Sequence, residues 1–182
     1  MGKGIDNLKL KKRSEKLAFL EVKSSGDGAS SYARLEGFTT QTHNANASEY
    51  DRRYVDEDTN RVDVTGYSES INYNFDYYLE QPALEEIVKI TEGEKVGTDA
   101  VRNVIVVDMT TVNQSSGNNY TARATIRPFA IVPSSNGDST DCQTYSGDFK
   151  SRGEKENITV VRGDKDWNTI TIQESTSTTA SE

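Results

Sequence analysis

The sequence has very few of the residues that catalytic and metal sites require. Its 182 residues include one histidine, His43, and one cysteine, Cys142. Structural zinc sites take several Cys and His ligands, and a Ser/His/Asp or Cys/His catalytic group would depend on His43 alone. Because His43 lies in the polar stretch "THNANAS", we interpret it as a surface loop residue. We therefore expect no enzymatic activity, no metal site and no cofactor.

Long hydrophobic runs are also missing. No stretch approaches the length of a membrane span, and the N-terminus lacks the apolar segment of a signal peptide. A single cysteine has no partner for an intrachain disulfide, which is typical of proteins that fold in a reducing compartment. We expect a soluble protein made in the cytoplasm. Hydrophobic residues make up only 33% of the chain, which is lean for a globular monomer.

The charge is negative overall but unevenly distributed. The net charge is −8, which argues against general nucleic-acid binding. Residues 1–16 carry six basic and two acidic side chains, a net of +4, so residues 17–182 carry −12. Opposite patches of this kind favour head-to-tail association of copies, whereas a solvated tail is the alternative interpretation. The candidate contacts of this basic arm are Lys9, Lys11, Lys12 and Arg13.

Most of the chain has the alternating pattern of β-strands. In residues 71–78, Ile71, Tyr73 and Phe75 alternate with polar residues, which predicts a strand with one wet face. Pro128 places the later part of segment 120–132 at an edge or strand end. These patterns predict a mainly β fold, an antiparallel β-sandwich or open barrel. The predicted strands are 15–23, 31–40, 67–78, 101–112, 120–132, 142–154, 157–163 and 167–173, with loops at 115–119 and 134–141.

One segment breaks the strand pattern and predicts a short helix over residues 82–92. Pro82 suits the first helical turn, and Gly93 offers a stop in the left-handed conformation. Leu84, Ile87 and Val88 form a narrow apolar stripe, so we expect this helix to pack against the strands by one face.

Residues 41–61 form a long charged segment with almost no aliphatic content. Loops of this length inside a compact domain are usually functional or disordered, and an extended two-stranded flap with arms 49–55 and 61–67 is the alternative. Asp56, Asp58 and Asn60 match the first ligands of a calcium loop, but Arg61 replaces its glycine and Tyr67 its glutamate, so we expect no calcium site. The charged residues of the segment are Glu49, Asp51, Arg52, Arg53, Asp56, Glu57, Asp58 and Arg61.

The order of these parts resembles the tail tube (major tail) proteins of bacteriophages. A basic arm (1–14) precedes two early strands, a long charged loop, and an alternating strand that leads into the helix through "EQPALEEIVKI". The closing "SGDFKSRGE" is similar to the late strand of that family, in which a Gly, an alternating Lys and a further Gly recur. The resemblance covers most of the chain as architecture, and it includes no catalytic motif.

This resemblance implies a structural virion protein of the phage tail. It implies a β-sandwich domain (15–173) flanked by one helix, between the arm and a disordered polar tail (174–182). Copies would form hexameric rings that stack into a hollow tube, with other tail proteins as further partners. One sheet of each copy would join its neighbours in a continuous barrel, and DNA would pass through without specific binding. Loop 41–61 and the arms would reach the next ring. An acidic channel wall would repel phosphates, and Asp76 and Asp148, on polar strand faces, are the candidate acids.

A monomeric β-sandwich binding module for a carbohydrate or protein ligand is the alternative function. It would use Trp167, in the turn sequence "GDKDWN", together with the tyrosines. The more frequent role of such a tryptophan is to close the end of the sandwich, and we favour that interpretation of Trp167.

Overall fold

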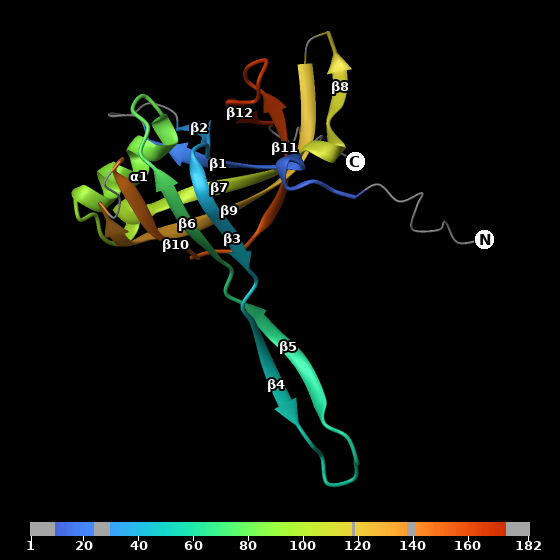
Figure 1. Ribbon diagram of the computed structural model, residues 1–182. Coiled ribbons are helices and arrows are strands. Elements are labelled where there is room, and N and C mark those ends of the chain that lie inside the picture. Colours follow the sequence, from blue (N-terminus) through green and yellow to red (C-terminus); the bar gives the residue numbers. More distant parts are fainter. Residues whose placement is uncertain (1–9, 24–29, 118, 138–140, 174–182) are drawn as a thin grey trace, which may run out of the picture.

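The computed structural model describes residues 10–23, 30–117, 119–137 and 141–173. The first nine residues of the predicted arm, including Lys9, and the predicted tail 174–182 lie outside these ranges. The fold is mainly antiparallel β with one α-helix, which confirms the predicted fold class (Figure 1). The helix is α1 (Pro82–Glu92), and the 3-10 helices are η2 (Arg13–Glu15), η3 (Gly97–Ala100) and η4 (Met109–Thr111). The strands are β1 (Lys16–Val22), β2 (Ser31–Arg34), β3 (Phe38–Asn44), β4 (Ala47–Arg52), β5 (Arg61–Tyr67), β6 (Ser70–Asp76), β7 (Val101–Asp108), β8 (Asn113–Ser116), β9 (Asn119–Asn136), β10 (Thr144–Ser151), β11 (Glu156–Arg162) and β12 (Thr169–Ile172).

Six strands close into a barrel. Each pairs with the next in the order β1, β2, β12, β11, β9, β7, and β7 pairs back with β1. Phe19, Ile105 and Val160 belong to the core of this barrel, and each is fully buried. Trp167 joins the same core and is only 8% exposed, at a backbone φ of 57°. Its role as a plug is therefore confirmed, and its ring offers no exposed platform for a sugar.

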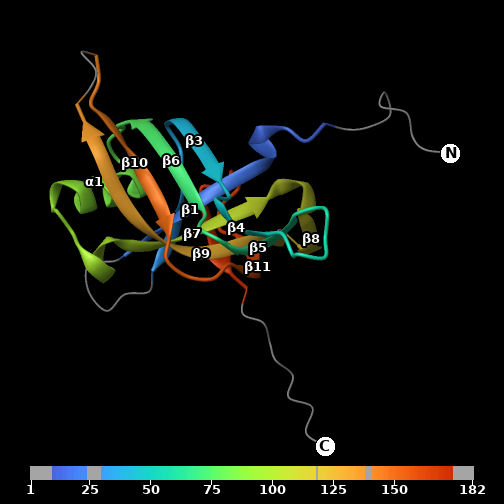
Figure 2. The same ribbon diagram turned by 90° about the horizontal axis from the view of Figure 1, so that it is seen from below.

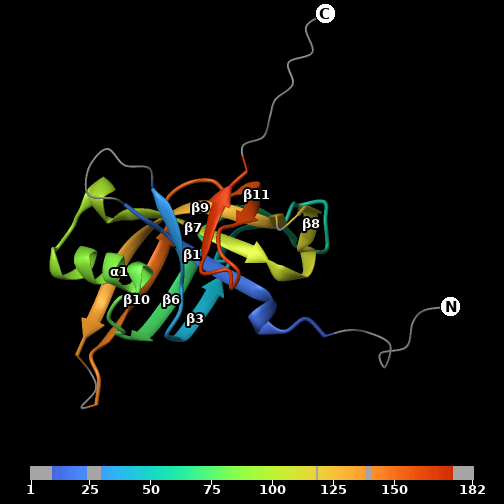
Figure 3. The same cartoon turned by 90° about the horizontal axis from the view of Figure 1, so that it is seen from above.

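The long strand β9 leaves the barrel and continues into a second sheet. Its residues 121–126 pair with β11, whereas residues 129–136 pair with β10. Strands β6 and β3 then follow β10 in the sheet. We call the four-stranded sheet made of residues 129–136, β10, β6 and β3 the wing. Views from below and above place α1 beside the wing and β8 at the opposite side of the molecule (Figures 2 and 3).

Helix α1 fills the space between the wing and the barrel wall. Its Leu84 and Ile87 are fully buried, in one core with Phe75 and Phe149 of the wing and Leu20 of the barrel. Val88 belongs to this core as well. The buried surface is wider than the predicted stripe, because Ala83, Glu86 and Ile90 are also buried. Pro82 begins the helix, as predicted, and Gly93 caps its end. The left-handed conformation predicted for Gly93 is wrong, because its φ is −80°.

A buried ion pair joins α1 to the barrel. Glu86 is 3% exposed and Arg102, on β7, is 6% exposed. The Arg102 Nε donates to Glu86 Oε1 at 2.7 Å, and its Nη1 donates to the carbonyl oxygens of Asp99 at 2.9 Å and Val101 at 2.7 Å. A buried charge is tolerated when it is paired and hydrogen-bonded in this way.

The prediction of one strand over residues 31–40 is wrong. The chain changes sheets there: β2 pairs with β1 and β12 in the barrel, whereas β3 pairs with β6 in the wing. Between them Gly37 adopts a φ of +80°, a conformation that favours glycine. The alternation changes phase at this break, since Ala33 and Leu35 precede it on odd positions and Phe38 follows it on an even one.

The later part of the predicted segment does lie at an edge, because β9 beyond Ala130 pairs only with β10, whereas the strand does not end there. Pro128 itself lies inside β9. It falls between Ile126, the last residue paired with β11, and Phe129, the first paired with β10. At this change of partner no ladder bond requires the missing N–H of proline, and its carbonyl oxygen accepts from the Arg152 N–H at 2.9 Å. Residues 134–136, predicted as loop, extend β9 instead, and the strand β8 was not predicted.

Segment 41–61 is not a loop, and its flap alternative is confirmed. Residues 41–44 complete β3, and β4 and β5 form a separate antiparallel ribbon with Ala47 opposite Tyr67 and Arg52 opposite Arg61. This hairpin, residues 47–67, projects away from the barrel and the wing (Figure 1). His43 correspondingly lies in β3 and is partly buried, so its interpretation as a surface loop residue is wrong.

Candidate assembly surfaces

The hairpin exposes an unusual amount of apolar surface. Every residue of β4 is exposed, and so is every residue of β5 except Gly66. Contiguous exposed apolar surface on a soluble protein marks an interaction site, and a two-stranded ribbon is marginally stable on its own. Half of the large exposed hydrophobic residues of the described chain lie here: Tyr50, Tyr54, Val55, Val62, Val64 and Tyr67.

The two faces of the hairpin differ in chemistry. On one face, Val62 and Val64 lie opposite the acidic residues Asp51 and Glu49. The other face is more basic. Arg52 and Arg61 are cross-strand partners there, and the Arg52 guanidinium donates to the Tyr50 hydroxyl at 2.8 Å. The tip between the strands contains the other charged residues predicted for contacts, Arg53, Asp56, Glu57 and Asp58. All eight predicted contact residues therefore lie on this one projecting element.

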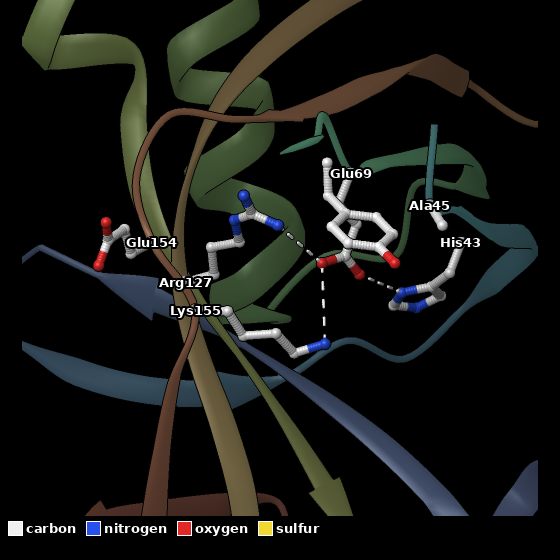
Figure 4. A pocket seen from close by; sticks show the side chains of 7 residues that line it. His43, Ala45, Glu69, Arg127, Glu154 and Lys155 are labelled. Atoms are coloured by element: carbon white, nitrogen blue, oxygen red, sulfur yellow. Dashed lines mark hydrogen bonds and ion pairs between the residues drawn. The ribbon is translucent and has the colours of Figure 1, made fainter. Parts of the chain in front are cut away.

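Glu69 anchors the base of the hairpin to three separate segments (Figure 4). Its Oε1 lies 3.5 Å from His43 Nδ1 in β3, and its Oε2 lies 3.3 Å from Arg127 Nη1 in β9 and 3.9 Å from Lys155 Nζ. Burial is the main cause that lowers the pKa of His43. These residues, with Tyr67, line a cavity of about 650 Å³. Sequence reasoning missed Glu69, because its partners come from distant positions in the chain.

Asn46 provides a second brace at the hairpin base. Its side-chain amide donates to the Ser68 carbonyl oxygen at 2.9 Å and lies 2.9 Å from the Ser70 hydroxyl. The Ser68 N–H in turn donates to the Asn46 carbonyl oxygen at 3.1 Å. The two chain segments that enter and leave the hairpin are thus joined directly, which fixes its direction relative to the wing.

The outer face of the wing is polar along β3, β6 and β10, and Val132 and Ala130 of β9 add apolar groups to it. Ile71, Tyr73 and Phe75 point into the core, so the alternate residues of β6 face outward. Asp148 lies opposite Asn72, which donates to it, and Asp76 lies opposite Thr144. Both predicted acids are therefore on this face, together with Lys150. The other polar residues of the face are Thr40, Thr42, Asn44, Ser70, Asn74 and Ser146.

The wing has two free edges within the described residues. Strand β3 is the last strand on one side and pairs only with β6. On the other side, β9 pairs with β7 as far as Ala130, so residues 131–136 have a partner on their β10 side alone. Free edges offer unpaired N–H and C=O groups to another chain.

Two cations of the basic arm bond within the chain. Lys11 Nζ lies 2.6 Å from Asp108 Oδ2, and this contact is the main cause that lowers the pKa of Asp108 to about 2. Arg13 donates to Gln41 Oε1 at 2.7 Å and to the Lys16 carbonyl oxygen at 2.9 Å. Lys12 is exposed. The start of the described chain is thus held beside β7 and β3.

The described residues contain neither a metal-binding cluster nor a membrane-spanning helix. No group of three His, Cys, Asp or Glu side chains there could hold a metal ion. None of the described helices is both long and apolar enough to cross a membrane.

The fold of this chain is similar to that of proteins of known structure, although its sequence matches none of the families or curated proteins compared. No protein-family model and no curated protein matches the chain. A chain from the tail of an empty GTA particle, determined with C6 symmetry, superimposes with a TM-score of 0.55 at 15% identity, over 81% of this chain and 98% of that one. This chain therefore has the same fold as that chain of the GTA tail. A chain of the sixfold-symmetrised baseplate of the anti-feeding prophage aligns more weakly, with a TM-score of 0.40 at 9% identity, over 79% and 92% of the two chains. The superposition on the GTA tail chain confirms the predicted resemblance at the level of the fold.

Proposed function

We propose that this protein is a structural subunit of a phage-type tail, in which copies form rings that stack into a hollow tube for DNA delivery. The observation that carries the proposal is the wing, a sheet with a polar outer face and two free edges. Pairing β3 of one copy with residues 131–136 of the next removes both edges and makes a continuous barrel around the ring. The C6 symmetry of the GTA tail supports six copies per ring.

The packing of α1 determines which face of the wing can line the channel. The inner face is covered by Leu84, Ile87 and the rest of the core, so only the polar face is free to meet water and DNA. Asp76 and Asp148 lie there against one cation, Lys150. Arg127 is paired with Glu69 and Arg123 belongs to the barrel part of β9, so neither adds positive charge to this face.

An acidic channel wall lets DNA slide because sticking requires cations that neutralise phosphates. We propose that Asp76 and Asp148 contribute to this wall. A density map of the assembled tube tests the assignment: a net basic wall, or a wall formed by another face, contradicts it.

The hairpin is proposed as the contact between successive rings. Its exposed valines and tyrosines and its mixed charges suit a surface that is covered on assembly, each exposed ion pair adding less than about 1 kcal/mol but repeating around a ring. The arm residues Lys9, Lys12 and their neighbours are proposed to add contacts beside it. The protein would then reside in the virion tail, with itself and other tail proteins as partners and with no catalytic role.

The test is to assemble the full chain and a variant without the hairpin. The Asn46–Ser68 hydrogen bond allows these residues to be joined through Gly-Gly. The full chain should form rings or tubes in negative-stain micrographs and sediment well above 20 kDa at high concentration. The variant should keep its β-sheet circular dichroism and form no tubes. A full chain that remains monomeric at all salt concentrations contradicts the proposal and favours the alternative, a monomeric binding module. Because Trp167 is buried, such a module would have to bind its ligand through other residues.

A further inference from the structure

One face of the hairpin combines exposed apolar groups with negative charge. Val62 and Val64 are 57% and 55% exposed, and their cross-strand partners are Asp51 and Glu49. We call these four residues the valine face. Within the described chain no cation forms an ion pair with either carboxylate, and Asp51 accepts from the Asn60 amide at 3.4 Å. The valine face therefore offers two apolar groups and two carboxylates to a partner.

The hairpin as a whole favours a partner that is both apolar and basic. Residues 47–67 contain six acidic side chains and three arginines, a net charge of −3. Among the described strands, β4 and β5 pair with each other and with no third strand. Such a ribbon is marginally stable until further apolar contacts cover it. Apolar contact at the centre with opposite charges around it is the usual composition of a protein–protein interface.

The basic arm has the composition that the valine face requires. Residues 1–16 carry a net charge of +4 whereas residues 17–182 carry −12, so the arm is the part of a neighbouring copy with the opposite charge. Its first described residue, Leu10, is 86% exposed. The nine residues before it add two apolar and two basic side chains against one acid: Ile5, Leu8, Lys3, Lys9 and Asp6.

The arm of the same chain is too short to cover the valine face. Arg13 is held at Gln41 by its hydrogen bond of 2.7 Å, and β3 leads from there toward the hairpin (Figure 1). From Gln41 to Asp51 the extended chain advances roughly 30 Å. Leu8 precedes Arg13 by five residues, a reach of roughly 17 Å, which falls short even with the length of the arginine side chain added. An arm that covers this face therefore belongs to another copy.

We propose that the basic arm of one copy binds the valine face of the hairpin of another copy. Leu8 and Leu10 then cover the two valines, and the Lys9 ammonium reaches the carboxylates beside them along its flexible stem. This inference rests on the proposed function, and it identifies the segment that covers the hairpin when copies assemble. The arm and the valine face are different surfaces of one chain, so the contact is heterologous and repeats from copy to copy.

Disulfide trapping between two separate variants tests the pairing. Both variants carry Cys142→Ser, because Cys142 is exposed. One then carries Leu8→Cys and the other Val64→Cys. The matched control replaces Val64→Cys with Asp63→Cys, since Asp63 is also exposed but, as the neighbouring residue of β5, points to the opposite face.

Mixtures of two variants are assembled, oxidised and separated on a non-reducing gel. The mixture of Leu8→Cys with Val64→Cys should give at least about fivefold more covalent dimer than the mixture of Leu8→Cys with Asp63→Cys. Equal yields, or more dimer with Asp63→Cys, in mixtures that sediment as assemblies overturn this inference alone. Mixtures that remain monomeric before oxidation overturn the proposed function, and this inference with it.

A charge variant tests the electrostatic part of the contact. Adding Asp51→Lys to the Val64→Cys variant should lower its trapping by Leu8→Cys at least about threefold, because the arm then meets a cation on the valine face. Asp58→Lys makes the same change of charge at the hairpin tip and should leave the yield within about twofold. An equal loss in both charge variants, or no loss in either, contradicts the assignment of the arm to the valine face.

Discussion

The barrel and the wing differ in whether the edge strands of their sheets are paired within the chain. The barrel pairs β12 with both β2 and β11, so its ring of six strands closes within one chain. The wing ends in β3 on one side and in residues 131–136 on the other, and both edges remain open. Their interiors differ less, because each has its own buried cluster of apolar side chains. The difference teaches that the open edges do not result from weak folding and are available for pairing with other copies.

The largest expected effect comes from breaking the ion pair that joins the two regions. Arg102→Ala leaves the Glu86 carboxylate buried without its partner, which should lower the free energy of unfolding by about 3–5 kcal/mol. Denaturant titration followed by circular dichroism measures the loss. The double variant Glu86→Leu with Arg102→Met should recover most of the stability, and an equally unstable double variant would show that Arg102 acts through its packing instead.

Alkaline pH should lower the stability of the fold through Tyr145 in the wing. Burial, followed by its hydrogen bond to Glu92 at 2.6 Å, raises the pKa of Tyr145 to about 12. Between pH 10 and pH 12 the folded state keeps this proton while the unfolded state releases it. The contribution of Tyr145 to the free energy of unfolding is therefore fully present below pH 10 and is lost as the pH rises toward 12. The decline is at most about 2.7 kcal/mol for this group. Unfolding measured at several pH values should show a smaller decline in Tyr145→Phe, and an unchanged decline would exclude Tyr145 as its source.

Two glycines allow a matched test of packing in the wing and in the hairpin. A Cβ at Gly147 would lie 2.5 Å from the Val132 carbonyl oxygen and 2.6 Å from the Tyr73 hydroxyl oxygen, whereas a Cβ at Gly66 meets nothing within 4 Å. Gly147→Ala should therefore cost about 1–3 kcal/mol of stability, and Gly66→Ala should leave it nearly unchanged. Thermal unfolding of both variants gives the comparison, and similar melting temperatures would contradict it.

The smallest expected effect on stability concerns the hairpin anchor. Glu69→Gln removes the charge that faces Arg127, Lys155 and His43, at a cost of about 1–2 kcal/mol. Amide hydrogen exchange should accelerate around Asn46 and Ser68, while the barrel strands keep their protection. Glu154→Gln, an exposed change on the same cavity, serves as the control. Faster exchange throughout the chain would show that Glu69 stabilises the whole fold, not the hairpin base.

Sequence patterns correctly predicted those parts of the structure that depend on residues close together in the chain. Alternation in residues 71–76 identified the buried and wet faces of β6, and Pro82 and Gly93 identified the ends of α1. The same patterns failed where distant segments decide the outcome. Gly37 separates two strands that join different sheets, and Pro128 is tolerated because two other strands meet beside it. Glu69 has partners near residues 43, 127 and 155, which no short window of sequence brings together.

The closure of the barrel has a consequence for when the protein can act. Ala33 in β2 pairs with Thr169 in β12, so the ring of strands waits for almost the last described residues to be synthesised. The strand pairing of the hairpin involves only its own residues, whereas the anchor at its base also needs Arg127 and Lys155. Completion of β12 therefore closes the body of the subunit late in synthesis, after the anchor residues of the hairpin are already present.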